Sequence, residues 1–173
     1  MKIALGADHR GYQTKERLKT VLLNLGHEVV DCGCTSEKSC DYPDFSVPAC
    51  LRVTRGQADR AVLLCGSGIG MSITANKVAG IRAALCHDEL TAEISRRHND
   101  ANVLCLPADL IGDDLVERMI EVWLNTEFDG GRHERRVKKT MAAERHLRDT
   151  DPNKPSAKRS RPKGETTQKR EFT

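Results

Sequence analysis

The chain has 173 residues, a length typical of one domain with or without a tail. Apolar residues make up 38% of the sequence, which is enough for one core. No run approaches the roughly 18 consecutive apolar residues that a membrane helix needs. The N-terminus, MKIALGADHRG, carries charge too early and too short an apolar run for a secretory signal. We therefore expect neither a membrane protein nor a secreted one, and predict a cytoplasmic location.

The net charge of +3 is unevenly distributed along the chain. Residues 148–173 carry eight Lys or Arg and four Asp or Glu, so residues 1–147 are close to neutral. Residues 148–173 also contain three prolines and few apolar side chains, and such a segment cannot bury enough surface to offset its ordering entropy. The sequence predicts one domain over 1–147 and a disordered basic tail over 148–173. Nucleic-acid binding is not expected beyond weak contacts of this tail.

Seven cysteines are present, an odd number. With no secretory signal, free thiols are expected. Cys32, Cys34 and Cys40 lack a second Cys or His pair at zinc-ribbon spacing, so no structural metal is predicted. Cys86 and Cys105 lie in apolar runs, where a buried, inert thiol is the ordinary expectation.

Short apolar runs alternate with amphipathic stretches from the N-terminus onward. The runs predict strands over 2–5, 28–31, 60–65, 81–86 and 102–106. The stretches between and after them predict helices over 11–25, 43–55, 69–77, 89–98, 112–125 and 131–147. Strands that alternate with helices indicate parallel βαβ units, so the fold class is α/β, with a five-stranded parallel sheet covered on both faces.

Polar clusters adjoin the predicted strands. They are residues 6–11, residues 65–72, the pair His87 and Asp88, and residues 97–100. Ligands of open parallel sheets bind outside the carboxyl ends of the strands. We therefore expect these clusters to converge at that edge.

The segment Cys65-Gly66-Ser67-Gly68-Ile69-Gly70 is the most informative cluster. Its three glycines allow a tight bend that directs backbone N–H groups toward an anion. It is neither a Walker loop nor a good dinucleotide fingerprint. Cys65 precedes a helix N-terminus, which favours a thiolate, and a thiolate beside backbone donors suits the removal of a carbon-bound proton. The alternative is a tight turn with a buried cysteine.

The other candidate residues each have a structural alternative. His98 could be a catalytic group or merely a helix cap or surface residue. Asp8 could cap a helix. Arg132 and Arg136 are four positions apart and share a helix face, which suits either phosphate binding or solvent exposure.

Five segments resemble one known family. They are GADHRGY (6–12), DYPDF (41–45), CGSGIGMSITANKVAGIRAALCHD (65–88), RRHNDANVL (96–104) and FDGGRH (128–133). In this order they are similar to the type B ribose-5-phosphate isomerases, whose relatives isomerise galactose 6-phosphate and allose 6-phosphate. The resemblance implies a three-layer Rossmann-like α/β/α sandwich, without metal or organic cofactor. It also implies a homodimer, or a tetramer, with active sites at the subunit interface.

The same resemblance assigns roles in an aldose–ketose isomerisation through a cis-enediolate. Cys65 would be the base, and His98 would assist ring opening. The enediolate would be held by Gly66, Ser67, Gly68, Ile69 and Gly70. Asp8 and Asn99 would contact sugar hydroxyls, whereas His9, Arg132 and Arg136 would bind the phosphate.

One position departs from the family pattern. Asp109 stands where the family usually has an arginine of the phosphate site, and a carboxylate there would repel a phosphate. We therefore expect weakened phosphate affinity or a shifted substrate. Ribose 5-phosphate is the first expectation; a six-carbon sugar phosphate, or a non-catalytic phosphosugar-binding role, is the alternative.

Overall fold

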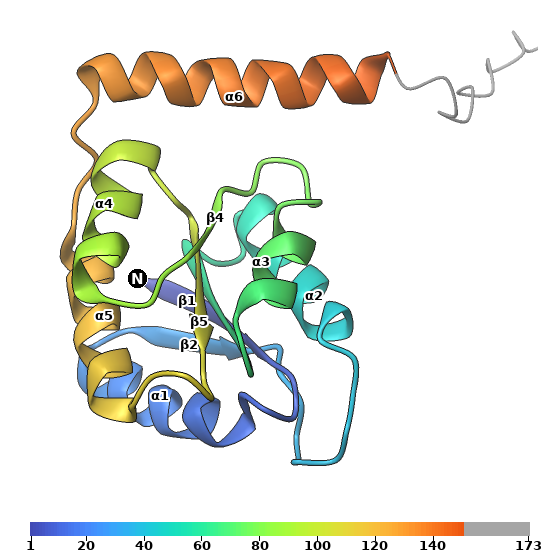
Figure 1. Cartoon of the computed structure of the whole chain (residues 1–173), viewed down its shortest axis with the longest axis vertical. Helices are drawn as coiled ribbons and strands as arrows, with labels where there is room; N and C mark the ends of the chain where they lie inside the picture. The colour runs from blue at the N-terminus through green and yellow to red at the C-terminus, as the bar shows by residue number, and fades with distance from the viewer. Residues whose placement is uncertain (151–173) are drawn as a thin grey trace, which may run out of the picture.

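The computed structural model describes residues 1–150, so nearly all of the predicted basic tail lies outside the described residues. Strands and helices alternate as the sequence predicts (Figure 1). The strands are β1 (Lys2–Ala7), β2 (Glu28–Asp31), β3 (Arg60–Cys65), β4 (Ala83–Leu85) and β5 (Val103–Pro107). The helices are α1 (Tyr12–Asn24), α2 (Pro43–Thr54), α3 (Ile69–Ala75), α4 (Glu89–Asn99), α5 (Asp113–Asn125) and α6 (Gly131–Asp149). None of the helices within residues 1–150 combines the length and apolar composition that crossing a bilayer requires.

The five strands form one parallel sheet in the order β2-β1-β3-β5-β4. Strand β3 is central, and its neighbours β1 and β5 pair with it along most of its length. The predicted α/β class with a five-stranded parallel sheet is therefore confirmed. The carboxyl ends of β1, β3 and β5 lie side by side at one edge of the sheet.

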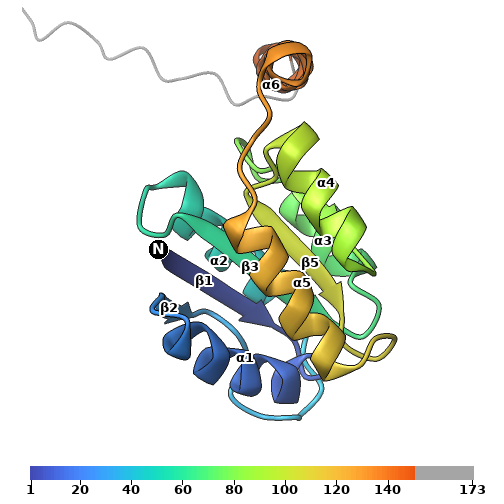
Figure 2. The ribbon, with the colours of Figure 1, turned by 90° about the vertical axis from the view of Figure 1, so that its left-hand side faces the viewer.

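Helices cover both faces of the sheet, as the continuous apolar strands require. On one face, α1, α4 and α5 pack over residues such as Leu5, Leu64 and Leu106. On the other face, α2 and α3 pack over Leu63, Cys65 and the remaining alternate strand residues. Figure 2 shows the sheet between these two layers. The predicted Rossmann-like α/β/α sandwich is thus present.

Strand β4 is shorter than the run 81–86 predicts. Its first two predicted residues, Ile81 and Arg82, lie between the strand and a preceding turn, which is closed by a hydrogen bond from the Ile81 N–H to the Val78 carbonyl. Arg82 is held from the side by Asn102, whose Oδ1 accepts a hydrogen bond from the Arg82 N–H at 2.8 Å. Because β4 is at the edge of the sheet, it pairs with β5 alone, and only Ala83, Ala84 and Leu85 take part in that pairing.

Helix α6 extends beyond the layered body (Figures 1 and 2). An extended connector leads to it from the end of α5, and α4 is the helix against which it lies. Glu144 tethers it further along, since its carboxylate accepts a hydrogen bond from the Gly80 N–H at 2.9 Å. Most of its side chains are exposed, and His133 is the one buried residue described in it.

Candidate active site

Three loops meet where β1, β3 and β5 end, and backbone hydrogen bonds tie them together. The Asp8 N–H donates to the Leu64 carbonyl at 3.2 Å. The Ala108 N–H donates to the Cys65 carbonyl at 2.9 Å, and the Asp109 N–H donates to the Gly66 carbonyl at 3.0 Å. The loops that begin at Asp8, Gly66 and Ala108 therefore form one continuous rim, which we call the carboxyl rim.

Cys65 ends β3 within this rim, and only 4% of the residue is exposed. The chain then turns sharply into α3. The turn depends on Gly68, whose φ of +71° is a left-handed conformation and where an added Cβ would come within 2.4 Å of Leu85 Cδ1. Ser67 faces the same turn, because its Oγ accepts a hydrogen bond from the Ile69 N–H at 3.4 Å. A thiol, a hydroxyl and a glycine-rich stretch of backbone are thus brought together.

The seven cysteines are all free, as the sequence predicts. Burial raises the pKa of Cys50 to about 11 and that of Cys105 well above its ordinary value. Burial also raises the pKa of Cys86. These three thiols stay protonated at neutral pH and serve as core side chains, as expected for Cys86 and Cys105.

Asp8 and His9 follow β1 in the carboxyl rim. Asp8 is buried, and its Oδ1 accepts hydrogen bonds from the N–H groups of Arg10 at 2.9 Å and Gly11 at 3.2 Å. Asp8 thus stabilises the turn before α1 and does not cap the helix as the sequence suggested, since the N-cap residue is Gly11 and no side chain caps it. The His9 Nδ1 accepts a hydrogen bond from the Cys40 N–H at 3.3 Å, which leaves Nε2 to carry the ring proton. His9 can therefore donate from Nε2.

The sequence-based assignment missed two further residues, Tyr42 next to the carboxyl rim and Arg10 within it. The Tyr42 ring lies over Gly70, where an added Cβ would come within 2.7 Å of the phenol ring. Arg10 pairs with Asp109 beside Gly66. Tyr42 lies within the DYPDF segment, which belongs to the family resemblance, but the resemblance assigned Tyr42 no role. Nothing in the local sequence linked Arg10 to Asp109.

His98, Asn99, Arg132 and Arg136 do not join the carboxyl rim. His98 and Asn99 lie in the last turn of α4, which precedes the first residue of β5. A crossover helix runs antiparallel to the strands it connects, so its end lies at the amino edge of the sheet. The expectation that residues 97–100 converge with Cys65 at the carboxyl edge is therefore wrong within one chain. His87 and Asp88, which directly precede α4, do lie at the carboxyl edge.

The residues at the amino edge form a second cluster, which we call the α4–α6 cleft. The His98 and His133 rings stack with centroids 4.1 Å apart and planes 5° from parallel. Asp129 lies beside both rings, with its Oδ2 4.0 Å from His98 Nε2. A hollow of about 500 Å³ opens here. Its walls include Asn76, Arg82, His98, Asn99, His133 and Arg136.

Charge in the α4–α6 cleft is mainly positive. Arg97 Nε donates to Asp129 Oδ1 at 3.2 Å, and this hydrogen bond holds the Asp129 pKa below its ordinary value. Burial, together with the charges of His98, Arg132 and Arg136, lowers the pKa of His133. A neutral His133 can accept the hydrogen bond that Arg132 Nε donates to its Nε2 at 3.2 Å. Arg136 lines the hollow itself, which makes the cleft suited to an anion.

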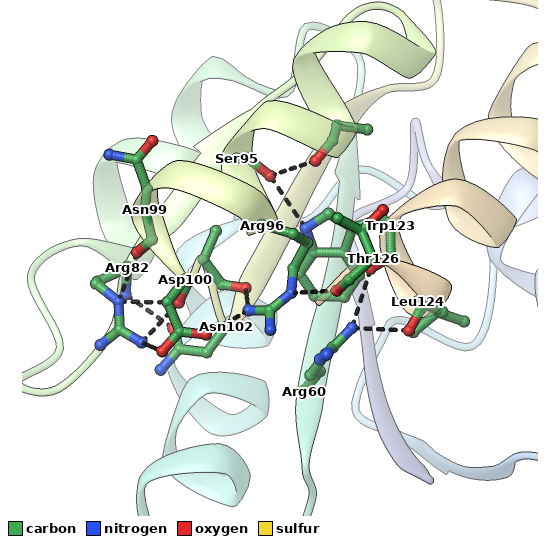
Figure 3. A network of polar contacts seen from close by, with 12 residues as sticks. Arg60, Arg82, Ser95, Arg96, Asn99, Asp100, Asn102, Trp123, Leu124 and Thr126 are labelled. Carbon is green, nitrogen blue, oxygen red and sulfur yellow. Dashed lines mark hydrogen bonds and ion pairs between the residues drawn. The ribbon is translucent and has the colours of Figure 1, made fainter. Parts of the chain in front are cut away.

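A network of arginine contacts surrounds the C-terminal end of α4 (Figure 3). Asp100 has a left-handed φ of 46° and ends α4. Its carboxylate pairs with Arg82 and with Arg96, each at 2.8 Å. Arg96 also donates to the Ala101 carbonyl at 2.6 Å and stacks over Trp123 at 5.9 Å. The end of α4, and with it His98, is therefore rigidly placed.

His98, Asp129 and His133 have ligand types and spacings that a divalent cation could use, with ligand atoms within 4.8 Å of one another. However, Arg97 already donates a hydrogen bond to the Asp129 carboxylate, and Arg132 donates one to the Nε2 of His133. These two guanidinium groups oppose a cation electrostatically. The donor set therefore fits an anionic ligand better than a metal.

Comparison with known proteins identifies relatives along almost the whole described chain. Residues 3–140 match the family described as Ribose/Galactose Isomerase. Ribose-5-phosphate isomerase B of Escherichia coli is 41% identical over 143 residues, which cover 83% of this chain and 96% of that protein. D-erythrulose-4-phosphate isomerase of Pectobacterium atrosepticum is 40% identical over 141 residues, covering 80% and 92%.

A solved structure agrees in detail. Ribose-5-phosphate isomerase B of Clostridium thermocellum superposes with a TM-score of 0.84 at 45% identity, and the match covers 85% of this chain and 99% of that one. Identity at this level across the full domain extends well beyond a shared fold. The resemblance carried by the five sequence segments is confirmed: the chain belongs to the ribose/galactose isomerase family and is an isomerase.

Proposed function

We propose that the protein interconverts ribose 5-phosphate and ribulose 5-phosphate. The observation that carries this proposal is the buried Cys65 at the start of a glycine-rich turn, in a chain whose relatives include ribose-5-phosphate isomerases. Among the chain's buried thiols, Cys65 is the one that adjoins such a turn. A base next to backbone donors is what an aldose–ketose isomerisation needs.

In the proposed reaction, the Cys65 thiolate removes the proton from C2 of the open-chain aldose. The electron pair forms the C1–C2 double bond, and negative charge collects on O1 in a cis-enediolate. The turn at Gly66 to Gly70 and the Ser67 hydroxyl stabilise that charge. The hydroxyl proton then moves from O2 to O1, C2 becomes the ketone, and Cys65 returns its proton to C1.

His98, Asn99, Arg132 and Arg136 must reach the same substrate for their proposed roles in ring opening, hydroxyl recognition and phosphate binding. Within one chain they lie at the opposite edge of the sheet from Cys65. We therefore propose a homodimer in which the carboxyl rim of one copy faces the α4–α6 cleft of the other. The exposed Ile69 and Ile73 on α3, next to the rim, support a contact there.

The first test is formation of ribulose 5-phosphate from ribose 5-phosphate by the purified protein. Replacing Cys65 with Ala should reduce kcat by about 10²- to 10⁴-fold, the range for loss of a general base. Cys50→Ala serves as the matched control, because it also truncates a buried thiol but one within α2 rather than at the turn. Full activity in Cys65→Ala would refute the assignment of the base.

A mixing experiment tests the shared site. Cys65→Ala and His98→Asn should each be nearly inactive alone. If sites combine residues of two copies, co-expression should restore about a quarter of wild-type activity, because half of the dimers are mixed and each has one intact site. If both residues act within one chain, the mixture stays inactive.

A six-carbon sugar phosphate is the second candidate substrate. The family description includes galactose, and Asp109 alters the rim where a substrate would lie. Assays with allose 6-phosphate and galactose 6-phosphate beside ribose 5-phosphate decide between them by the ratio of kcat/KM.

A further inference from the structure

Arg10 and Asp109 form a close ion pair on the carboxyl rim. Arg10 Nε donates to Asp109 Oδ2 at 2.9 Å, and Nη2 lies 2.8 Å from the same oxygen. The pair joins the loop after β1 to the loop after β5. Asp109 is itself anchored, because its N–H donates to the Gly66 carbonyl at 3.0 Å.

The pair lies directly beside the Cys65 turn. A Cβ added to Gly66 would come within 2.5 Å of Asp109 Oδ2 and 3.7 Å of Arg10 Cβ. The residue that follows Cys65 is thus covered on its Cα side by these two side chains. A ligand held by the turn therefore lies next to them.

Arg10 keeps donors for such a ligand. A guanidinium has five N–H groups, and those on Nη1 have no partner within residues 1–150. Lys15, the buried cation nearby, is by contrast fully engaged. Its three donors go to Asp31, Glu16 and the Cys34 carbonyl.

Asp109 and Arg10 have opposite effects on an anion. Alone, the carboxylate beside Gly66 would repel a phosphate. In the pair the two charges offset each other, and the carboxylate restrains the Arg10 side chain, which is 59% exposed. A restrained guanidinium loses less entropy when it binds an anion.

We propose that Arg10, oriented by Asp109, binds the phosphate of the substrate at the carboxyl rim. Asp109 is then a positioning residue that acts through Arg10. This proposal rests on the proposed isomerase function for its substrate. It also predicts that Arg10 contributes to the binding of inorganic phosphate, which can be measured without turnover.

The test compares Arg10→Ala with the wild-type enzyme. We expect KM for ribose 5-phosphate to rise about tenfold with kcat changed less than about threefold, since the phosphate keeps its charge throughout the reaction and a contact to it is made in both ground and transition states. The inhibition constant of inorganic phosphate should rise in parallel. Arg17→Ala is the matched control, because Arg17 also bridges carboxylates, namely Asp113, Asp114 and Glu117, but on the outer helices.

Asp109→Ala separates positioning from repulsion. If Asp109 orients Arg10, its removal should raise KM about two- to fivefold, and Arg10→Ala should add little in the double variant. If Asp109 merely repels phosphate, Asp109→Ala lowers KM and the positioning role is overturned. An unchanged KM and an unchanged phosphate inhibition constant in Arg10→Ala would overturn the binding role.

Calorimetric titration with inorganic phosphate keeps the two proposals separable. Should the wild-type protein isomerise no sugar phosphate, the proposed function fails, yet weaker phosphate binding by Arg10→Ala than by Arg17→Ala would still support this inference. Equal phosphate binding by these two variants would overturn it regardless of activity.

Discussion

His98 and His133 stack face to face, with ring centroids 4.1 Å apart and planes 5° from parallel. The stack joins the last turn of α4 to the first turn of α6, across the connector that carries Asp129. It is the contact through which a helix lying outside the layered body fixes the position of a proposed catalytic ring. His133 thus has a geometric role that the sequence motif FDGGRH did not reveal.

Replacing His133 with Ala should leave His98 without its stacking partner. We expect kcat to fall about 10- to 100-fold, because a displacement of about 1 Å at a reacting group has effects of that size. His133→Phe preserves a flat ring and should retain more activity. The measurement is kcat for both variants at pH 7.5, and equal losses would contradict a stacking role.

Stability should depend on pH through His133. Burial and the neighbouring charges of His98, Arg132 and Arg136 lower its pKa from the ordinary value of 6.5. Between the two pKa values the unfolded chain binds more protons, so stability rises with pH in that window and is lost as pH falls below about 6.5. Thermal unfolding from pH 7.5 to 5 should show a steeper loss for wild type than for His133→Phe. Parallel curves would contradict this.

Asp100 should be sensitive to both charge and backbone conformation. Asp100→Ala removes the carboxylate that pairs with Arg82 and with Arg96. It also places alanine, which lacks a polar side chain to stabilise a left-handed backbone, at φ 46°. We expect a loss of about 2–4 kcal/mol in the free energy of unfolding. Asp100→Gly also removes the carboxylate but relieves the backbone strain, so it should lower the free energy of unfolding less than Asp100→Ala does. Denaturant unfolding measures both variants. If glycine were as harmful as alanine, the backbone would contribute nothing.

The buried Lys15 supports the loop after β2. Burial alone would lower its pKa, but hydrogen bonds to Asp31 and Glu16 outweigh burial and raise it. Desolvation likewise opposes the charge on Asp31, yet the hydrogen bond from Lys15 holds its pKa below 3.8. Lys15→Met should cost about 1–3 kcal/mol of stability.

The Asp31 contribution has a defined pH range. A depressed carboxyl pKa adds stability above about pH 4, and this stability is lost as pH falls through the lowered value. The difference in Tm between wild type and Asp31→Asn should therefore shrink below about pH 4. A constant difference down to about pH 2.5 would show that the charge of Asp31 is irrelevant.

Gly68→Ala should destabilise the turn after Cys65. A side chain there requires a φ near +71° and contacts Leu85 at 2.4 Å, so we expect about 1–3 kcal/mol of destabilisation together with reduced kcat. Gly112→Ala is the matched control, because its φ of −75° is ordinary and no atom lies within 4 Å of the added Cβ. Thermal unfolding compares the two. Equal, small effects would refute the proposed strain.

Local pattern was sufficient to predict the strands and helices, because buried parallel strands and amphipathic helices differ in period. Cys65 and its turn could also be predicted, since both lie within one contiguous segment. The edge at which His98 lies could have been inferred from chain order, because residues 97–100 precede the predicted strand 102–106 and the residues before a strand of a parallel sheet lie at its amino edge. The error was to treat a polar cluster that precedes a strand like one that follows it.

Contacts between distant segments were also beyond the reach of local pattern. The Asp109 carboxylate was expected to disturb phosphate binding, and the structure places it against Arg10 instead. The Tyr42 ring over Gly70 depends on how α2 packs beside α3. Both relationships arise from the order of the strands in the sheet, which single-segment periodicity does not specify.

The Arg10–Asp109 pair has an evolutionary consequence. The two positions are 99 residues apart in sequence but share one hydrogen-bonded contact beside Gly66. A mutation at either position alone leaves an unmatched charge next to the turn after Cys65, so the fitness cost of one mutation depends on the residue at the other position. Positions 10 and 109 should therefore covary across descendants of this protein, with substitutions fixed as pairs.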